Sequence, residues 1–249
     1  MTRIDSRDIS AACDGLTRQG YALLQDVVAA EKFHALHRQF NSRYAHYLRD
    51  VEYEETLKVG DRRYRVPVEL AGGFADPDVW ANATVLDIVR GMLGDDAILD
   101  AFGAVVSLPG AAAQHVHRDS PLLFDAAIAP LLPCHALTLA LPLVDMDETR
   151  GTTALWPGSH RWKARAEGPA PETPRVPAGA CLLWDYRLFH GGTPNRSAEP
   201  RPMLYATYAR AWYRDPTGFT RQGLDRLAMP AGFLDGLPPE RRRLFSHLA

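Results

Sequence analysis

Between residues 97 and 213, short apolar segments with a strand-like pattern alternate with turns that contain proline and glycine. The strand-like segments are residues 97–108, 136–144, 152–156, 181–189 and 203–213. Turns at Pro109-Gly110, Pro157-Gly158 and residues 177–179 separate several of them. Short strands that alternate with such turns are typical of a sandwich or a jelly roll. The sequence therefore predicts a β-core over about residues 96–215.

The segment before this core has a helical pattern. Helices are expected at residues 6–18, 29–44 and 77–94, because apolar side chains recur there near helical spacing. A short strand is expected at 20–25, and a turn at Gly60-Asp61 predicts two further strands. We expect a single domain over 1–249, with a helical and substrate-contacting part over about 1–95 and a helical tail over 216–249.

Composition excludes several classes of function. The net charge of −2 is close to neutral and carries no basic stripe, which argues against a nucleic-acid binder. No apolar run reaches the roughly 20 residues that span a bilayer, and the N-terminus lacks the apolar core of a secretory signal. Three scattered cysteines without a CxxC pattern are expected to be reduced thiols in a cytoplasmic protein. The sequence contains no heptad repeat, so it predicts no particular oligomeric state.

The segment His115-Val116-His117-Arg118-Asp119 contains three side chains of metal-binding type. Side chains two apart on a strand point to the same face, roughly 6.5–7 Å apart along it, so His117 and Asp119 would both reach one ion while Arg118 turns away. A second strand that carries His190 would complete a set of two histidines and one carboxylate. That set leaves open positions on the metal, which suits non-haem Fe(II) and O₂ chemistry.

Three known metal patterns compete for this segment. A metallo-hydrolase of the β-lactamase type uses HxHxDH, but position 120 is Ser120. A bicupin-like HxH site requires a glutamate a few residues later, and Ser120-Pro121-Leu122 supplies none. The third pattern uses HxD with a distant histidine. A polar strand face turned to solvent is the simplest alternative to all three.

Three further groups accompany these candidates. Arg201 opens the last strand, so parity would place Met203, Tyr205 and Thr207 on its face. A guanidinium there matches the carboxylate of an organic acid, although a surface charge is the alternative. Asp185 and Arg187 are expected to form a local ion pair or to anchor a loop. His160 lies in a turn without a partner at ligand spacing, so it is not expected to bind metal.

Taken together, the motifs resemble the phytanoyl-CoA dioxygenase family of Fe(II)/2-oxoglutarate-dependent oxygenases. In chain order, the matching segments are Gly20–Leu24, Pro109-Gly110, Gln114–Asp119, Gly151–His160, Asp185–Gly192 and Asn195–Arg201. Each segment alone is a weak signal, and their order gives the resemblance its specificity. The resemblance implies a mainly β fold with flanking helices, a double-stranded β-helix of the jelly-roll, cupin-like type. It covers residues 45–80 poorly.

The resemblance also implies roles for individual residues. His117, Asp119 and His190 match the iron ligands, and Arg201 matches the arginine that binds the distal carboxylate of 2-oxoglutarate. Gln114 and Thr153 lie where the family often contacts this co-substrate. His115 is interpreted as a neighbour of the site. Since related halogenases replace the carboxylate with Gly or Ala, Asp119 favours oxygenation over halogenation.

The implied activity is hydroxylation of a small molecule with O₂, releasing succinate and CO₂; desaturation or ring formation are variants. The substrate would be a secondary metabolite, an amino-acid-like acid or a carrier-linked acid. Candidates to line its approach are Arg62, Arg63, Tyr64, Arg65, Trp184, Tyr186 and Trp212. The three arginines Arg62, Arg63 and Arg65 favour an anionic substrate. The alternative is that they belong to a salt-bridged hairpin on the surface. The alternatives are a jelly-roll metal-binding protein without turnover and a zinc or manganese hydrolase on the same ligands.

Overall fold

Eight strands form one mixed sheet in the computed structural model, which describes residues 3–5, 7–165, 170–215 and 225–248. In their order across the sheet they are β1 (Arg3–Asp5), β2 (Tyr21–Gln25), β8 (Cys181–Asp185), β6 (Ala136–Pro142), β10 (Arg201–Ala209), β5 (Ile98–Ser107), β4 (Arg63–Pro67) and β3 (Leu57–Gly60). The pair β1–β2 is parallel, and all other neighbours are antiparallel. This sheet forms most of the predicted β-core.

A second sheet pairs β7 (Thr153–Leu155) with β9 (His190–Gly192) in antiparallel register. His117 joins β9 through an isolated antiparallel bridge to His190. The two sheets do not close into a barrel in the part of the chain that the structure describes. This small sheet brings the two histidines together from segments far apart in the sequence.

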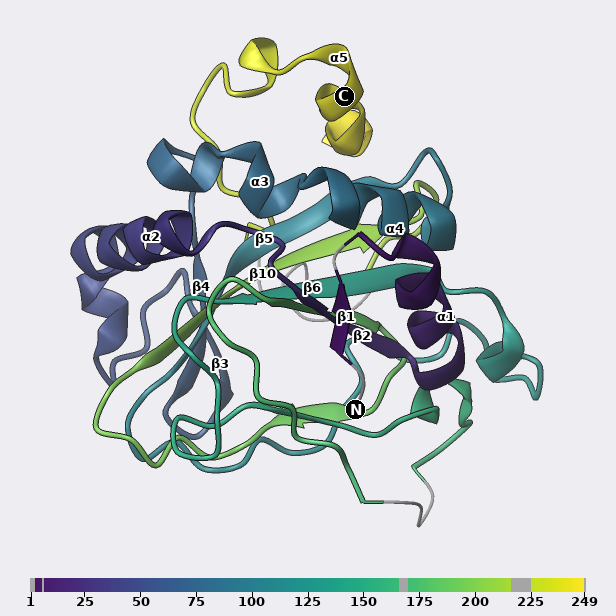
Figure 1. Ribbon diagram of the computed structural model, residues 1–249, viewed down its shortest axis with the longest axis horizontal. Helices are drawn as coiled ribbons and strands as arrows, with labels where there is room; N and C mark the ends of the chain where they lie inside the picture. The colour runs from purple at the N-terminus through teal and green to yellow at the C-terminus, as the bar shows by residue number, and fades with distance from the viewer. Residues whose placement is uncertain (1–2, 6, 166–169, 216–224, 249) are drawn as a thin grey trace.

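Helices cover one face of the large sheet. They are α1 (Ile9–Gln19), α2 (Ala30–Arg43), α3 (Pro77–Trp80) and α4 (Ala83–Leu93), and the short α5 (Pro239–Arg242) lies near the C-terminus. Figure 1 shows α2, α3 and α4 in a row along the sheet, with the C-terminal segment beyond α3 and α4. That segment packs edge-on through Phe245 against Trp80, with ring centroids 5.5 Å apart. The main apolar core therefore lies between the sheet and these helices.

Alternation along β10 separates the core from a polar pocket. Leu204, Ala206 and Tyr208 belong to the apolar core. Arg201, Met203, Tyr205 and Thr207 line a pocket on the opposite face, as parity predicts. The helices therefore bury one face of the sheet and leave the other for a functional site.

Three strand predictions needed correction. Residues 114–119 do not form a regular strand, because only His117 pairs there. The segment 181–189 is broken after Asp185 by a turn, and β9 begins at His190. The last strand begins at Arg201, as predicted, but it ends at Ala209, short of the predicted residue 213. The short N-terminal β1 was not predicted, since three residues give no periodicity to read.

The helix predictions were closer. Residues 77–94 form α3 and α4, which are separated at Ala81 and Asn82; the Asn82 side chain accepts hydrogen bonds from the first turn of α4. The first helix begins at Ile9, and residue 6 lies outside the described residues. In the tail, residues 225–248 contain α5 and short 3-10 turns, and residues 216–224 lie outside the described part.

The three cysteines are free thiols, as expected. No helix among the described residues is both long and apolar enough to cross a membrane.

The turn that directly follows β8 contains a buried ion pair. The Asp185 carboxylate accepts hydrogen bonds from the backbone N–H, Nε and Nη2 of Arg187 at 2.7–2.9 Å. Arg187 also donates to the carbonyl of Leu132 at 2.5 Å. The expected pairing of Asp185 with Arg187 is therefore confirmed. Burial alone would raise the pKa of Asp185, but the hydrogen bonds and charge of Arg187 outweigh it and lower that pKa.

We expect Asp185→Asn to lower the free energy of unfolding by about 3–5 kcal/mol at pH 7, because it leaves the Arg187 charge buried without its partner. Because the pKa of Asp185 is lower in the folded protein, its carboxylate contributes to stability fully at pH values above its ordinary pKa of 3.8. This contribution is lost as the pH falls through the folded-state pKa. The difference between variant and wild type should therefore shrink in acid.

Urea unfolding at several pH values measures this difference. The matched control is Asp87→Asn, in an exposed pair with Arg90, which should change stability by no more than about 0.5 kcal/mol. An equal effect of the two substitutions at pH 7 would contradict the assignment of Asp185 as a buried anchor.

Candidate metal centre

His117, Asp119 and His190 lie together on the pocket face. Their ligand atoms all lie within 4.8 Å of one another. Each histidine backbone N–H donates to the other's carbonyl at 2.9 Å, and the two ring centroids are 4.4 Å apart. The structure therefore brings together the three residues that the sequence pattern selected, although only one of them lies in a regular strand.

Backbone carbonyls fix the orientation of both imidazoles. His117 Nδ1 lies 2.9 Å from the His115 carbonyl, and His190 Nδ1 lies 3.0 Å from the Leu188 carbonyl. A carbonyl only accepts hydrogen bonds, so each Nδ1 carries a proton, and the Nε2 atom of each ring is the one that would bind a metal when the ring is neutral.

The Asp119 carboxylate has two oxygens in different surroundings. Oδ2 accepts hydrogen bonds from Thr138 Oγ1 and Trp184 Nε1, both at 2.8 Å. These donors are a cross-strand pair of β6 and β8. Oδ1 lies 3.4 Å from His190 Nε2. The large sheet thus holds one oxygen and leaves the other directed at the histidines.

Burial and mutual charge shift the pKa values of all three side chains. Burial lowers the pKa of His117 to about 4, and His190 acts in the same direction. Burial opposes ionisation of Asp119, but the charge and hydrogen bond of His190 outweigh it and lower the pKa of Asp119 to about 2. Asp119 in turn raises the pKa of His190 against the effect of burial. A metal cation would take the place of the His190 proton as the partner of Asp119.

The three residues line a cavity of about 160 Å³. The same cavity is lined by Gln114, Thr153 and three arginines, namely Arg63, Arg65 and Arg201. Arg63 and Arg201 lie in one row, since both pair with Ser107 across β4, β5 and β10. The cavity therefore combines one carboxylate with several buried guanidinium groups.

Arg201 is 3% exposed and has weak protein partners. Its Nη1 lies 3.4 Å from the Thr152 carbonyl and 3.5 Å from that of Arg150, and its Nε has no hydrogen-bond partner among the described residues. Burial, aided by the nearby Arg63 charge, lowers the pKa of Arg201 to about 9. A buried cation with these contacts is suited to receive an anion, which would restore its lost solvation.

Arg63 is held beside Arg201 by a dense set of acceptors. Its guanidinium donates to the Gln114 side chain, the Ser107 hydroxyl and the Thr193 carbonyl at 2.9–3.2 Å. A Cβ at Gly192 would lie 2.0 Å from Arg63 Nη1, so glycine is needed there for the guanidinium to approach the backbone. Gln114 also accepts from the Gly192 N–H at 3.1 Å and thereby orients Arg63 against β9.

The other predicted residues divide between this cavity and its surroundings. Trp184 and Tyr186 line the cavity, whereas Arg62 and Tyr64 do not. Both of the latter side chains instead contact Asp50. Trp212 lines a separate, larger hollow.

The remaining histidines and arginine of the motifs lie outside the cluster. His115 is exposed, and His160 is buried near the Thr17 carbonyl. Arg118 turns away, as predicted, and its guanidinium lies 4.1 Å from the centroid of the Phe189 ring.

Thr138 is a site residue that sequence analysis missed. It is the one hydroxyl side chain within the otherwise apolar β6, and that contrast was the available signal. Its partner across the sheet, Trp184, had been interpreted only as a candidate for substrate contact. The indole N–H of Trp184 donates a hydrogen bond to Asp119.

Comparison with known proteins identifies relatives of this chain. The model of the phytanoyl-CoA dioxygenase (PhyH) family matches residues 16–203. Dioxygenase af480 of Aspergillus fumigatus is 28% identical over 176 residues, which cover 68% of this chain and 54% of that protein. Dioxygenase trt7 of Aspergillus terreus is 35% identical over 128 residues, covering 49% of this chain and 44% of that protein. The chain spans about half the length of these curated relatives.

Solved structures share the fold over nearly their whole length. The epimerase SnoN, in complex with Fe³⁺, alpha ketoglutarate and nogalamycin RO, has a TM-score of 0.67 at 20% identity, covering 94% of this chain and 96% of that one. HygX from Streptomyces hygroscopicus, with nickel, 2-oxoglutarate and hygromycin B bound, has a TM-score of 0.64 at 15% identity, covering 88% and 96%. These likenesses confirm the predicted jelly-roll fold.

We expect His117→Ala, Asp119→Ala and His190→Ala each to weaken Fe(II) binding by about 100-fold or more, because each removes one of three candidate ligands. Anaerobic titration with Fe(II), or with Co(II) as a coloured substitute, measures the affinity. The matched control is His115→Ala, which removes an exposed imidazole from the same segment and should bind metal like the wild type. Equal metal affinities of His115→Ala and His117→Ala would contradict the assignment.

Proposed function

Because this chain belongs to the phytanoyl-CoA dioxygenase family, we propose that it is an Fe(II)- and 2-oxoglutarate-dependent oxygenase that oxidises a small organic molecule. The observation that carries this proposal is the presence in one cavity of the His117–Asp119–His190 cluster and the buried Arg201. In this proposal the chain acts as a single domain, with the site on the pocket face of the large sheet.

The donor set fits Fe(II). Two imidazole nitrogens and one carboxylate oxygen provide the ligand types of the facial triad, and leave open positions for a co-substrate and O₂. The hydrogen bonds to both Nδ1 atoms and to Asp119 Oδ2 leave one donor atom of each residue for the metal. His117, Asp119 and His190 are therefore the proposed iron ligands.

The arginine row fits a dicarboxylate such as 2-oxoglutarate. Arg201 is the proposed partner of the distal carboxylate, because its buried guanidinium lacks a carboxylate partner among the described residues. Arg63, held by Gln114, adds a second positive charge next to it. Thr153 lines the same wall and is a further candidate contact. A cavity of about 160 Å³ matches a small dicarboxylate better than a large substrate.

When bound, iron, 2-oxoglutarate and O₂ supply the oxidising chemistry, in which succinate and CO₂ are released and one oxygen atom enters the substrate. The protein residues orient and protect this reaction. Thr138 and Trp184 hold Asp119, Arg201 fixes the co-substrate, and the buried walls limit access of water. We propose hydroxylation as the outcome; desaturation, ring formation and epimerisation use the same protein groups.

We expect Arg201→Ala to raise the apparent KM for 2-oxoglutarate about tenfold or more, since it removes a charge-assisted contact to the distal carboxylate. Formation of succinate that depends on O₂ and Fe(II) is the assay. The matched control is Arg196→Ala, which removes an exposed arginine from the preceding loop and should leave this KM unchanged. An unchanged KM in Arg201→Ala would mean that another residue binds the distal carboxylate of 2-oxoglutarate. Absence of succinate formation by the wild type would overturn the proposed function.

A further inference from the structure

A second hollow, of about 890 Å³, lies beside the metal pocket. One of its walls begins at Pro121, two residues after Asp119. Another is Tyr213, whose ring meets that of Tyr186 at right angles with centroids 6.3 Å apart. Tyr186 in turn lines the metal pocket. A molecule in the hollow would therefore adjoin the metal centre across the Tyr186–Tyr213 boundary.

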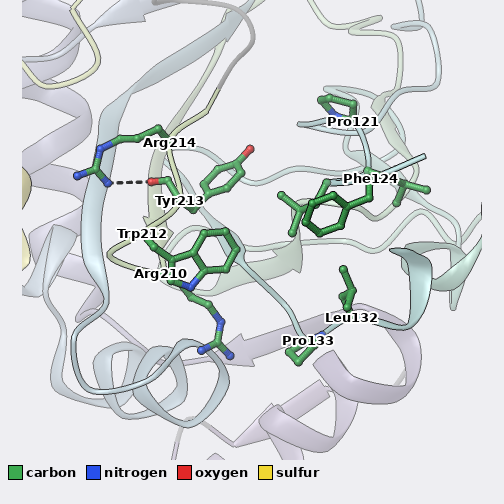
Figure 2. Close-up of a pocket in the computed structure, with 10 residues that line it drawn as sticks. Pro121, Phe124, Leu132, Pro133, Arg210, Trp212, Tyr213 and Arg214 are labelled. Atoms are coloured by element: carbon green, nitrogen blue, oxygen red, sulfur yellow. Dashed lines mark hydrogen bonds between the residues drawn. The ribbon is translucent and has the colours of Figure 1, made fainter. Parts of the chain in front are cut away.

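The walls of this hollow are apolar and aromatic. The apolar and aromatic lining includes Pro121, Leu123, Phe124, Leu132, Trp212 and Tyr213. Figure 2 shows Phe124 on one side of the hollow and the adjacent Trp212 and Tyr213 on the other. Apolar walls with a few polar groups are typical of sites for small organic molecules, which commonly measure about 300–1,000 Å³.

Two of these side chains are exposed to an unusual degree. Phe124 is 60% exposed and Trp212 is 62% exposed, and among the described residues they are the exposed aromatic side chains. They come from distant segments and meet at one hollow. Large apolar side chains that gather at a surface hollow mark an interaction site, because their exposure costs free energy until a ligand covers them.

The polar groups of the hollow restrict the ligand further. Arg210 and Arg214 donate to backbone carbonyls, and neither pairs with a carboxylate of the described chain. No acidic side chain lines the hollow as described. This charge pattern disfavours a cationic ligand.

We propose that this hollow holds the substrate, and that the substrate is a bulky, ring-bearing, largely apolar molecule, neutral or anionic. The inference rests on the proposed oxygenase function and specifies its substrate class. The ring system lies between Phe124 and Trp212 and extends past Tyr186 toward the metal pocket. A free amino-acid-like acid would leave both aromatic side chains uncovered.

The test uses anilinonaphthalene sulfonate, an anionic ring-bearing dye whose fluorescence rises in apolar surroundings. The dye is titrated without oxygen into the protein loaded with Fe(II) and 2-oxoglutarate. Trp212→Ala and Phe124→Ala should each weaken its binding by about three- to tenfold, because each removes an aromatic contact. Val51→Ala, which shortens an exposed apolar side chain outside the hollow, is the matched control and should bind like the wild type.

The outcomes separate this inference from the proposed function. Unchanged dye affinity in Trp212→Ala and Phe124→Ala, or displacement of the dye by 2-oxoglutarate, would overturn the inference while iron and co-substrate binding persist. Sedimentation could show that the wild type is a dimer and that Trp212→Ala is a monomer. That result would mean that a second copy of the chain occupies the hollow, and it would also overturn the inference. Failure of the wild type to bind Fe(II) and 2-oxoglutarate, with dye binding intact, would overturn the proposed function and not the ring-binding site.

Discussion

The carboxylate of Asp119 joins the two sheets of this protein, and the candidate metal centre depends on that junction. One oxygen accepts hydrogen bonds from Thr138 and Trp184 of the large sheet, and the other faces His190 of the small sheet. The segment that carries Asp119 is not a regular strand, so these hydrogen bonds and the His117–His190 bridge fix its position. Side-chain hydrogen bonds therefore position the candidate ligands although much of their backbone is irregular.

Burial of positive charge is the second constraint on the site. Arg63 and Arg201 lie side by side on the pocket face, and burial lowers the pKa of both, to about 10 and about 9. Such a row is costly without an anion, because two guanidinium groups lose solvation and repel each other. A dicarboxylate co-substrate would supply the missing charge. The adjoining hollow is instead apolar and aromatic, so the two cavities are suited to chemically different molecules.

Local sequence pattern predicted that His117, Asp119 and His190 lie together, the face of β10 and most element positions, because period-two spacing determines which side chains share a face. It could not predict which face of the 63–67 strand turns inward. Arg62 adopts a left-handed backbone conformation in the β3–β4 turn, and pairing with β5 then places Arg63 and Arg65 in the cavity while Arg62 and Tyr64 contact Asp50. That choice depends on a partner strand far along the chain, as does the recruitment of Thr138 to Asp119.

The central claim is that one cavity binds Fe(II) through His117, Asp119 and His190 and a 2-oxo acid against Arg201. The most direct measurement is the visible spectrum of the purified protein, recorded without oxygen, as Fe(II) and 2-oxoglutarate are added separately and then together. The account predicts a weak charge-transfer band that appears only with both, and that requires a higher 2-oxoglutarate concentration in Arg201→Ala. Absence of the band in the wild type, with the metal site occupied by tightly bound zinc, would contradict it.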